Sequence, residues 1–507
     1  MDVSTFPLLS FVRYFYFILF LLAGIVIGAQ EPDLHTIYAE AQSAESAGDL
    51  STAVQRYEQI IRLRPDMAEA HANLGTLYYQ EGQSANAESE FRKAASLKPE
   101  LAGPFFYLGV ISLDKGSPSE ALPLLRKAAA LDPANAMTFA CIGYALFAQG
   151  NNRGTLDALY HALTLGAGDG NIFYTLTEAA DALSAERASA LDKHFPQSAF
   201  SELARAHVYE AKRDYKQAAI LYAQASRKLP DNAALQNKLA WIDTRAKNNE
   251  APDRRDLDDL ADGALRFLYA PTEANNLEPS LLKVLQSANK YAQAANTAQT
   301  LYRSEDAYQS VSFLASLCLI GKYPDSFRSH QLRGKMLAQQ ARTDDAIAEY
   351  RKALELQPDA PDLHFAIGNL EWQQGRLEEA RKELETEIVS NPRHGPSFYE
   401  LGDIAYRQQR IGDAETALKQ SVKLDSSLKE AWLLLAKLQE QAQPQDSIAD
   451  LKRAIRIDPT DPAPHYSLMA LLRRQHRLAE SSNELATYKR LKEQLNANAP
   501  TVSLPSN

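Results

Sequence analysis

The sequence contains very few cysteines, and this scarcity limits the chemistry that the chain can carry. Cys141 and Cys318 are the only two among 507 residues, and neither belongs to a CxxC pair. A disulfide framework or a thiolate metal site therefore finds no support, because both need cysteines at defined spacings. Cys141 lies among apolar residues at a helical position, which predicts a small buried side chain.

The sequence also lacks the motifs of common catalytic and nucleotide-binding sites. It has no HExxH, GxSxG, Walker loop or Rossmann glycine fingerprint. The formal net charge is −10, whereas nucleic acid and anionic lipid both require a basic surface. The most basic stretch, residues 473–492, is interrupted by Glu480 and Glu484 and is typical of a solvated helix face. We expect a non-enzymatic protein with no cofactor, no metal and no nucleic-acid partner.

A long uncharged apolar run occurs close to the N-terminal end of the sequence. It extends over residues 14–28 and is followed by Ala29, a small residue at a typical cleavage position. This length is closer to a signal-peptide core than to the roughly 20 apolar residues that span a bilayer. Residues 1–29 are interpreted as a signal peptide, or as a membrane anchor if cleavage does not occur. In both cases we expect an exported chain in the periplasm or cell envelope.

Three residue types recur at intervals of 34 residues. In the N-terminal part the recurring positions are Pro65, Pro99 and Pro133; Ala53, Ala87 and Ala121; and Gly75, Gly109 and Gly143. The same spacings return in the C-terminal part at Gly334, Gly368 and Gly402; Ala346, Ala380 and Ala414; and Pro358 and Pro392. A fixed period of this size is typical of solenoid proteins.

The repeat resembles the tetratricopeptide repeat, which places Leu-Gly at positions 7 and 8, Ala at 20, an aromatic residue or Leu at 24 and Pro at 32. One clear match is formed by His71, Leu74, Gly75, Tyr78, Ala87, Phe91 and Pro99. Good matches begin at Leu34, Ala68, Ala102, Ala136, Ala199, Phe327, Pro361 and Gly395. Weaker copies begin at Gly170, Ala233, Lys429 and Pro462.

The spacing within one repeat predicts two helices that cannot fold alone. Positions 4, 7, 8 and 11 form one apolar helical stripe, and a proline ends the second helix. A single hairpin cannot cover its apolar faces, so neighbouring hairpins must stack. The resemblance implies an all-α fold, a right-handed superhelical α-solenoid of antiparallel helix hairpins.

The phase of the repeats predicts two arrays, residues 30–246 and 327–495. Residues 247–326 between them are interpreted as a linker followed by degenerate helical hairpins, and residues 496–507 as a disordered tail. The distance from Pro133 to Pro230 is five residues short of three periods. We place this deficit in Gly170–Ser198, where we expect a compressed second helix.

Four histidines occupy position 4 of their repeats, where other repeats carry Phe or Trp. They are His71, His330, His364 and His465. Equivalent positions in stacked hairpins lie about a helix diameter, ~10 Å, apart, whereas zinc needs each ring nitrogen at about 2.0–2.1 Å. We therefore expect these histidines to pack rather than to bind a metal.

The resemblance implies that positions 2, 5, 9, 12 and 13 of the first helices face a concave groove. Aromatic anchors beside hydrogen-bonding groups suit peptide segments or partner helices. The alternative is that some rings pack between successive first helices. The candidate groove residues are Tyr38, Tyr79, Phe106, Tyr144, Phe147, Tyr174, Phe365, Asn369, Trp372, Tyr399, Asp403, Tyr406 and Tyr466.

These features together favour an interaction scaffold of the cell envelope that binds protein or peptide partners. Attachment to a membrane would follow if the N-terminal segment stays uncleaved. The alternative is an accessory or regulatory subunit that positions a separately encoded enzyme. A stand-alone enzyme would need a compact site within residues 264–326.

Overall fold

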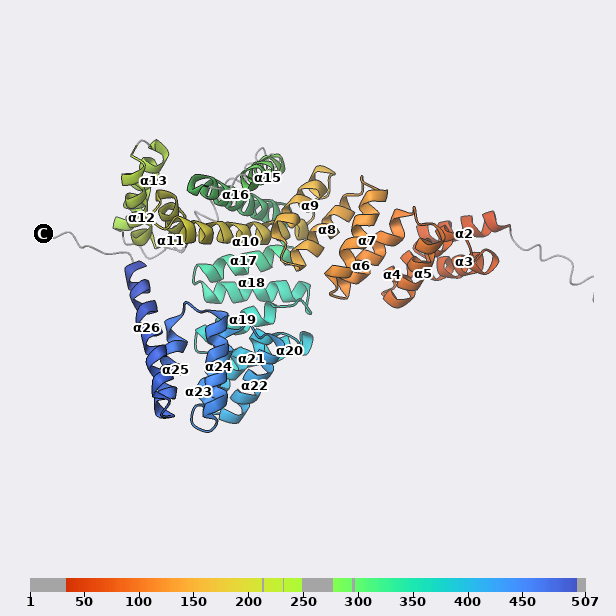
Figure 1. The fold of residues 1–507 in the computed structure, drawn as a ribbon. Helices are drawn as coiled ribbons and strands as arrows, with labels where there is room; N and C mark the ends of the chain where they lie inside the picture. The colour runs from red at the N-terminus through yellow and green to blue at the C-terminus, as the bar shows by residue number, and fades with distance from the viewer. Residues whose placement is uncertain (1–32, 212–213, 231, 249–276, 294–296, 499–507) are drawn as a thin grey trace, which may run out of the picture. The chain divides into compact units, whose positions relative to one another are not determined.

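The computed structural model describes residues 33–211, 214–230, 232–248, 277–293 and 297–498 (Figure 1). The predicted signal peptide or anchor, most of the predicted linker loop and most of the predicted tail lie outside these residues. Within them the secondary structure consists of α-helices and includes no strand, so the prediction of an all-α repeat fold is confirmed. None of the described helices is both long and apolar enough to cross a bilayer.

Contacts divide the chain into two units. Unit 1 consists of Met1–Ala190 and Glu278–Phe313, and unit 2 consists of Leu191–Leu277 and Leu314–Asn507. Four helix hairpins begin unit 1: α2 (Leu34–Ser46) with α3 (Leu50–Leu63), α4 (Ala68–Gln80) with α5 (Ser84–Leu97), α6 (Ala102–Asp114) with α7 (Pro118–Leu131), and α8 (Ala136–Ala148) with α9 (Asn152–Thr164).

Unit 1 also contains most of three longer helices, two of which end in unit 2, and hairpins again make up most of unit 2. The longer helices are α10 (Gly170–His194), α15 (Leu277–Gln293) and α16 (Ala298–Lys322). Unit 2 contains α11 (Ala199–Ala211) with α12 (Tyr215–Lys228), then α13 (Ala233–Asn248), α17 (Phe327–Gln339) with α18 (Thr343–Leu356), α19 (Leu363–Gln373) with α20 (Leu377–Ser390), α21 (Gly395–Arg407) with α22 (Ile411–Leu424), α23 (Lys429–Gln439) with α24 (Pro444–Ile457), and α25 (Pro462–Arg474) with α26 (Leu478–Asn498).

Glycine at position 8 allows the two helices of a hairpin to cross closely. A Cβ atom placed on Gly109 would lie 2.6 Å from Cγ of Leu125, and one on Gly143 would lie 2.5 Å from Cδ2 of Leu159. Both distances are below van der Waals contact. The repeated glycine thus fixes the separation of the helices, and the large residue at position 24 fills the space that it leaves.

In most hairpins the turn has a residue with positive φ at position 15. Glycine supplies it at Gly48, Gly82, Gly116, Gly150 and Gly375, with φ between 68° and 76°. In three hairpins of unit 2 a non-glycine residue adopts the same conformation, and these are Ala341, Gln409 and His476. Such residues are strained there, because a side chain crowds the left-handed region.

The prediction of a compressed second helix in Gly170–Ser198 is wrong. Residues 170–194 form one uninterrupted helix, α10, of 25 residues. Ser184 occupies the turn position, so no glycine interrupts the helix there. Its buried hydroxyl instead donates to Glu305 of α16 at 3.5 Å, and Ser312 of α16 donates to Asp181 at 2.5 Å. These two bonds connect α10 to α16.

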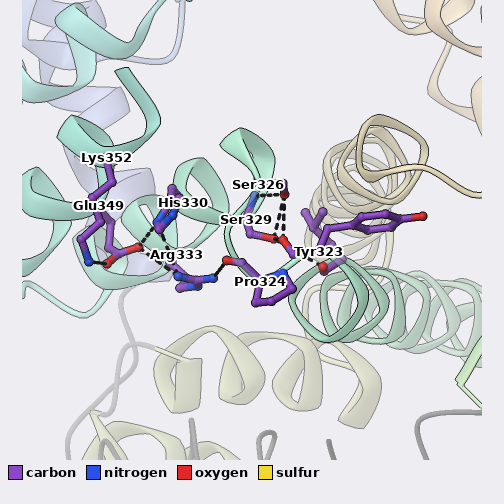
Figure 2. A network of polar contacts seen from close by, with 9 residues as sticks. Tyr323, Pro324, Ser326, Ser329, His330, Arg333, Glu349 and Lys352 are labelled. Carbon is purple, nitrogen blue, oxygen red and sulfur yellow. Dashed lines mark hydrogen bonds and ion pairs between the residues drawn. The ribbon is translucent and has the colours of Figure 1, made fainter. Parts of the chain in front are cut away.

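Two similar turns in unit 2 connect a 25-residue helix to a new hairpin. After α16, Ser329 Oγ donates to the carbonyl of Tyr323 at 2.6 Å, and Ser326 caps α17 by accepting from Ser329 N at 3.2 Å (Figure 2). After α10, Ser201 donates to the carbonyl of Phe195 at 2.6 Å, and its N–H donates to Ser198 at 3.1 Å. The chain therefore repeats a larger motif, a long helix followed by a capped hairpin.

Helix α19 begins two residues later than the other first helices. Its match to the repeat begins at Pro361, but Asp362 has φ 66° and the helix starts at Leu363. The carboxylate of Glu387, fully buried on α20, accepts the N–H groups of Asp362 at 3.1 Å and Phe365 at 3.2 Å. A side chain from the second helix thus satisfies the exposed end of the first.

Candidate protein-binding surface

The first helices of successive hairpins lie directly beside one another in each unit. Helix α4 contacts α6 and α6 contacts α8 in unit 1, while α19 contacts α21 and α21 contacts α23 in unit 2. Positions 5, 9 and 12 of these helices, with their polar neighbours, therefore form a continuous strip. We call this strip the first-helix surface of each unit, and it contains the candidate groove residues named above.

At the N-terminal end of unit 1, Asn73 of α4 connects Tyr38 of the first-helix surface to Tyr57, which is buried on the second helix α3. Asn73 Nδ2 donates to the hydroxyls of both Tyr38 and Tyr57 at 3.1 Å. Tyr57 in turn donates to Glu45 at 3.2 Å. Burial, followed by the negative charge of Glu45, raises the pKa of Tyr57 above its usual value. Tyr38 is thereby held in place by the next repeat.

The middle of the unit 1 surface is aromatic. Tyr79 donates to Asp114 at 3.0 Å, and its ring lies 5.7 Å from that of Tyr107. Tyr107 stacks on Phe91 at 4.9 Å and meets Phe106 edge-on at 5.2 Å. Burial and the bond to Asp114 raise the pKa of Tyr79 to about 12. The Tyr79 phenol therefore stays a neutral hydrogen-bond donor at physiological pH.

Farther along unit 1, Tyr144 donates to Asp169 at 3.4 Å. Asp169 also accepts the backbone N–H of Ile172 at 2.9 Å, which caps the start of α10. Phe147 and Tyr174 are half-buried on the same strip. Tyr144 is therefore oriented by the loop before the next first helix.

In unit 2, Trp372 and Asp403 join two neighbouring first helices. Trp372 Nε1 donates to Asp403 at 2.8 Å, and Arg407 Nε donates to the same oxygen at 2.5 Å. The guanidinium of Arg407 also lies 4.8 Å from the centre of the Trp372 ring. A ring, a carboxylate and a cation are thus combined within a single pair of repeats. The ring of Phe365, two turns before Trp372 on α19, lies 4.7 Å from the ring of His394.

Asn369 donates to the buried carboxyl of Glu400, which lies next to Asp403 on α21. Burial raises the pKa of Glu400 to about 7, since the charged form is poorly solvated there. Tyr399 packs against the cluster that contains Trp432. Burial, and then the nearby charge of Asp403, raises the pKa of Tyr399.

The most accessible of the predicted aromatic residues is Tyr466, toward the C-terminal end of unit 2. Tyr466 is 53% exposed and lies 5.2 Å from the ring of Tyr488. Tyr406 is half-buried, and Lys437 lies 5.0 Å from its ring centre.

The structure therefore brings most of the predicted residues into contact with the next repeat, and their binding role stays a prediction. Rings such as Tyr79 and Trp372 contact the neighbouring first helix, as the packing alternative expects, and they also remain partly exposed. The sequence-based set missed Tyr107 and the carboxylates of Glu45, Asp114, Asp169 and Glu400. The acidic groups among them could have been found from a simple signal, the scarcity of lysine and arginine on the same helices. Within the described residues, no group of three or more His, Cys, Asp or Glu could hold a metal ion.

Two family models match parts of both units. A model described as tetratricopeptide repeat matches residues 38–102 and 399–462, and one described as TPR repeat matches residues 334–375. No curated protein matches the sequence.

Among solved structures, YrrB, described as a TPR protein with an unusual peptide-binding site, is 17% identical over 36% of this chain and 96% of its own, with a TM-score of 0.30. MamA from Desulfovibrio magneticus RS-1 is 15% identical over 34% of this chain and 97% of its own, with a TM-score of 0.31. A chain of the APC/C hetero-tetramer Cut9–Hcn1 is 12% identical over 91% of this chain and 94% of its own, with a TM-score of 0.32.

Proposed function

Because this chain is a tetratricopeptide-repeat protein, we propose that it is a non-enzymatic scaffold that binds protein partners along its first-helix surfaces. Repeats of this family generally serve protein interaction. The observation that carries the proposal is the row of half-buried aromatic side chains that are hydrogen-bonded to the adjacent repeat. Tyr79 with Asp114 and Trp372 with Asp403 are the clearest cases.

These cross-repeat bonds support binding because they hold the rings in place before a partner arrives. An immobilised aromatic side chain loses less conformational entropy on binding than a free one. It also offers a large apolar face together with a polar edge, the combination that dominates binding energy at interfaces. The strip repeats this arrangement from one hairpin to the next, so an extended segment or a helix can contact several rungs.

We further propose that the protein is exported and acts in the cell envelope. The support comes from the apolar run at residues 14–28, which lies outside the described residues. Fractionation of the native host, followed by protease treatment of spheroplasts, tests the location. Recovery of the intact protein from the cytoplasmic fraction alone would rule out this part of the proposal.

The binding proposal is tested with the double variant Tyr406→Ser/Tyr466→Ser in the full chain. The control is Val389→Ser/Leu478→Ser, which removes two exposed side chains from second helices, 80% and 64% accessible. Chemical crosslinking in the native host should capture partners with the wild type and the control. Capture should fall at least about fivefold with the tyrosine variant, the loss expected for a free energy of binding reduced by about 1 kcal/mol.

The two variants should keep the helical content and melting temperature of the wild type. A similar loss of capture with the control would place the binding surface elsewhere. Turnover of a small molecule by the purified chain, with no polypeptide bound, would contradict the scaffold proposal as a whole.

A further inference from the structure

We propose that the first-helix surface of unit 1 binds an extended protein segment rich in lysine or arginine. The inference rests on the proposed function and adds the chemical class of the partner. It follows from three observations. The first is the distribution of charge among the helices of unit 1, and the second is that three of its carboxylates are bound by phenols and not by cations. The third is that in unit 2 an arginine completes a similar group of a ring and a carboxylate.

The first-helix segments of unit 1 contain no lysine or arginine. They comprise α2, α4, α6, α8 and the first half of α10, residues 170–182. Their acidic residues are Glu40, Glu45, Glu69, Asp114, Glu178 and Asp181. The basic residues of the same hairpins lie mainly on the second helices, for example Arg56, Arg92 and Lys127. The first helices of unit 1 are therefore purely acidic, whereas the second helices carry charges of both signs.

Three carboxylates on or beside this surface are held by phenols and not by cations. Glu45, Asp114 and Asp169 accept hydrogen bonds from Tyr57, Tyr79 and Tyr144. In the part of the chain that the structure describes, none of the three forms an ion pair. A neutral phenol orients a carboxylate without cancelling its charge. The carboxylates therefore remain available for a charge-assisted bond to an ammonium or guanidinium group.

Aromatic faces lie next to these carboxylates. Tyr79 bonds Asp114 and contacts the ring of Tyr107, which also meets Phe106. Aromatic faces attract cations electrostatically, and the attraction increases when the cation is partly desolvated. A carboxylate and ring faces within one pair of repeats provide two kinds of contact for the same basic side chain.

Unit 2 contains a similar combination that is already filled. There Arg407 donates to Asp403 at 2.5 Å and lies over the ring of Trp372 at 4.8 Å. The cation belongs to the same helix as the carboxylate. In unit 1 the pair formed by Tyr79 and Asp114 has no such arginine on its first helices. In unit 2 an arginine completes the group of ring and carboxylate. In unit 1 the basic side chain that would complete the group of Tyr79 and Asp114 must come from a partner.

The geometry of stacked helices suggests how the basic residues are spaced. Packed helices lie about 8–10 Å apart, and an extended chain advances about 3.3 Å per residue. A segment that crosses the first helices would therefore meet a new helix about every third residue. Glu45, Asp114 and Asp169 lie on α2, on α6 and directly before α10, so the segment would meet one of these carboxylates about every sixth residue. We expect the partner to carry lysine or arginine at that interval.

The test measures binding of a fluorescent 12-residue peptide, four copies of Lys-Ser-Ala, to the full chain by fluorescence anisotropy at low salt. A peptide with glutamate in place of lysine is the second probe, and one with serine is the third. The surface variant is Glu45→Gln/Asp114→Asn. The matched control is Glu100→Gln/Glu120→Gln, which removes the same charge from an exposed turn residue and an exposed residue of α7.

The lysine peptide should bind, and the surface variant should weaken binding roughly tenfold, as expected for two partly exposed charge pairs. The control should change binding less than about twofold. Because Asp114 is exposed, Asp114→Asn alone serves as a second variant if the double variant is unstable. It should weaken binding about threefold.

Equal weakening by the surface variant and the control would overturn the inference, since the peptide would then respond to net charge alone. Equally tight binding of the glutamate or serine peptide would overturn the basic partner but leave the proposed scaffold function standing. If no peptide bound and the crosslinking experiment also captured no partner, the inference and the proposed function would both fail.

Discussion

Nδ1 of His71 lies 2.5 Å from Oε2 of Glu90, and the same pairing joins a histidine at position 4 to a glutamate at position 23 in three other repeats. The corresponding distances are 2.7 Å for His330 with Glu349, 2.7 Å for His364 with Glu383, and 2.6 Å for His465 with Glu484. Figure 2 shows the pair formed by His330 and Glu349. Each bond links the first helix of a hairpin to the second.

Other repeats of the chain use an apolar pair at the same two positions. Where position 4 is Phe105 or Trp432, position 23 is Leu124 or Leu451. We therefore expect His71→Phe/Glu90→Leu to be close to wild type in stability. Each single change should cost about 1–3 kcal/mol, because it leaves a largely buried polar group without its partner. Urea denaturation of the wild type, the two single variants and the double variant measures the coupling free energy between His71 and Glu90. Additive effects of the two single changes would show that the pair contributes no specific stabilisation.

The close crossing of helices at position 8 predicts a strong effect of one methyl group. Gly143→Ala would place Cβ 2.5 Å from Leu159 and should lower the free energy of unfolding by about 1–3 kcal/mol. Gly103→Ala is the control, because no atom lies within 4 Å of the added Cβ, and it should cause no loss. Hydrogen exchange of α8 and α9 locates the effect. Equal stability of the two variants would mean that the hairpin widens freely.

The strained turn residues of unit 2 predict changes of opposite sign. Gln409 has φ 60°, so Gln409→Gly should stabilise the hairpin of α21 and α22 by about 0.5–1 kcal/mol. Gly375 has φ 75°, so Gly375→Ala should destabilise the hairpin of α19 and α20 by about 1 kcal/mol. Thermal denaturation of both variants tests this, and changes of the same sign would contradict it.

Glu305 on α16 predicts a pH dependence of the packing between α10 and α16. Burial, followed by the charge of Asp306, raises the pKa of Glu305 to about 8 from its ordinary value of 4.5. The folded state therefore binds the proton more tightly than the unfolded state. The contribution of the protonated Glu305 carboxyl to the free energy of unfolding is therefore complete below about pH 4.5 and is lost as the pH rises toward about 8. The slope has an upper limit of about 1.4 kcal/mol per pH unit.

Glu305→Gln keeps the shape of the side chain and removes its titration. In hydrogen exchange, peptides from residues 298–313 of the wild type should open more readily at pH 8 than at pH 5, after correction for intrinsic exchange. The glutamine variant should show a smaller difference. An unchanged difference would assign the pH dependence to another group. Gln309 and Ser184 both donate to this carboxyl, so their mutation is no substitute for the control.

Much of the helical order could be predicted from the sequence, because the packing residues define the period. The predicted repeat starts Ala68, Ala102 and Gly395 are the first residues of α4, α6 and α21. The continuous helix α10 could not be predicted from the period, because it depends on Ser184 and its contact with α16, 121 positions away in sequence. A local pattern contains no information about which distant helix contacts α10.

The candidate site shows the same limit. The positions of Tyr79 and Trp372 on the first helices followed from the repeat, but their bonds to Asp114 and Asp403 depend on how neighbouring hairpins stack. The pairing of histidine with glutamate was missed for a different reason. The constant offset of 19 residues between histidine and glutamate is visible in the sequence. The tetratricopeptide pattern, however, specifies no glutamate at position 23, so it does not predict the pair.

The contact of Glu387 with Asp362 and Phe365 also affects how α19 can unwind. A helix end normally frays first, since its outermost N–H groups exchange protein bonds for water at little cost. Here those groups are bound by a buried carboxylate from the opposite arm. Fraying of α19 would strand a charge in the interior unless α20 moved with it. The two arms should therefore open as one cooperative step, which makes this hairpin an all-or-none unit within the array.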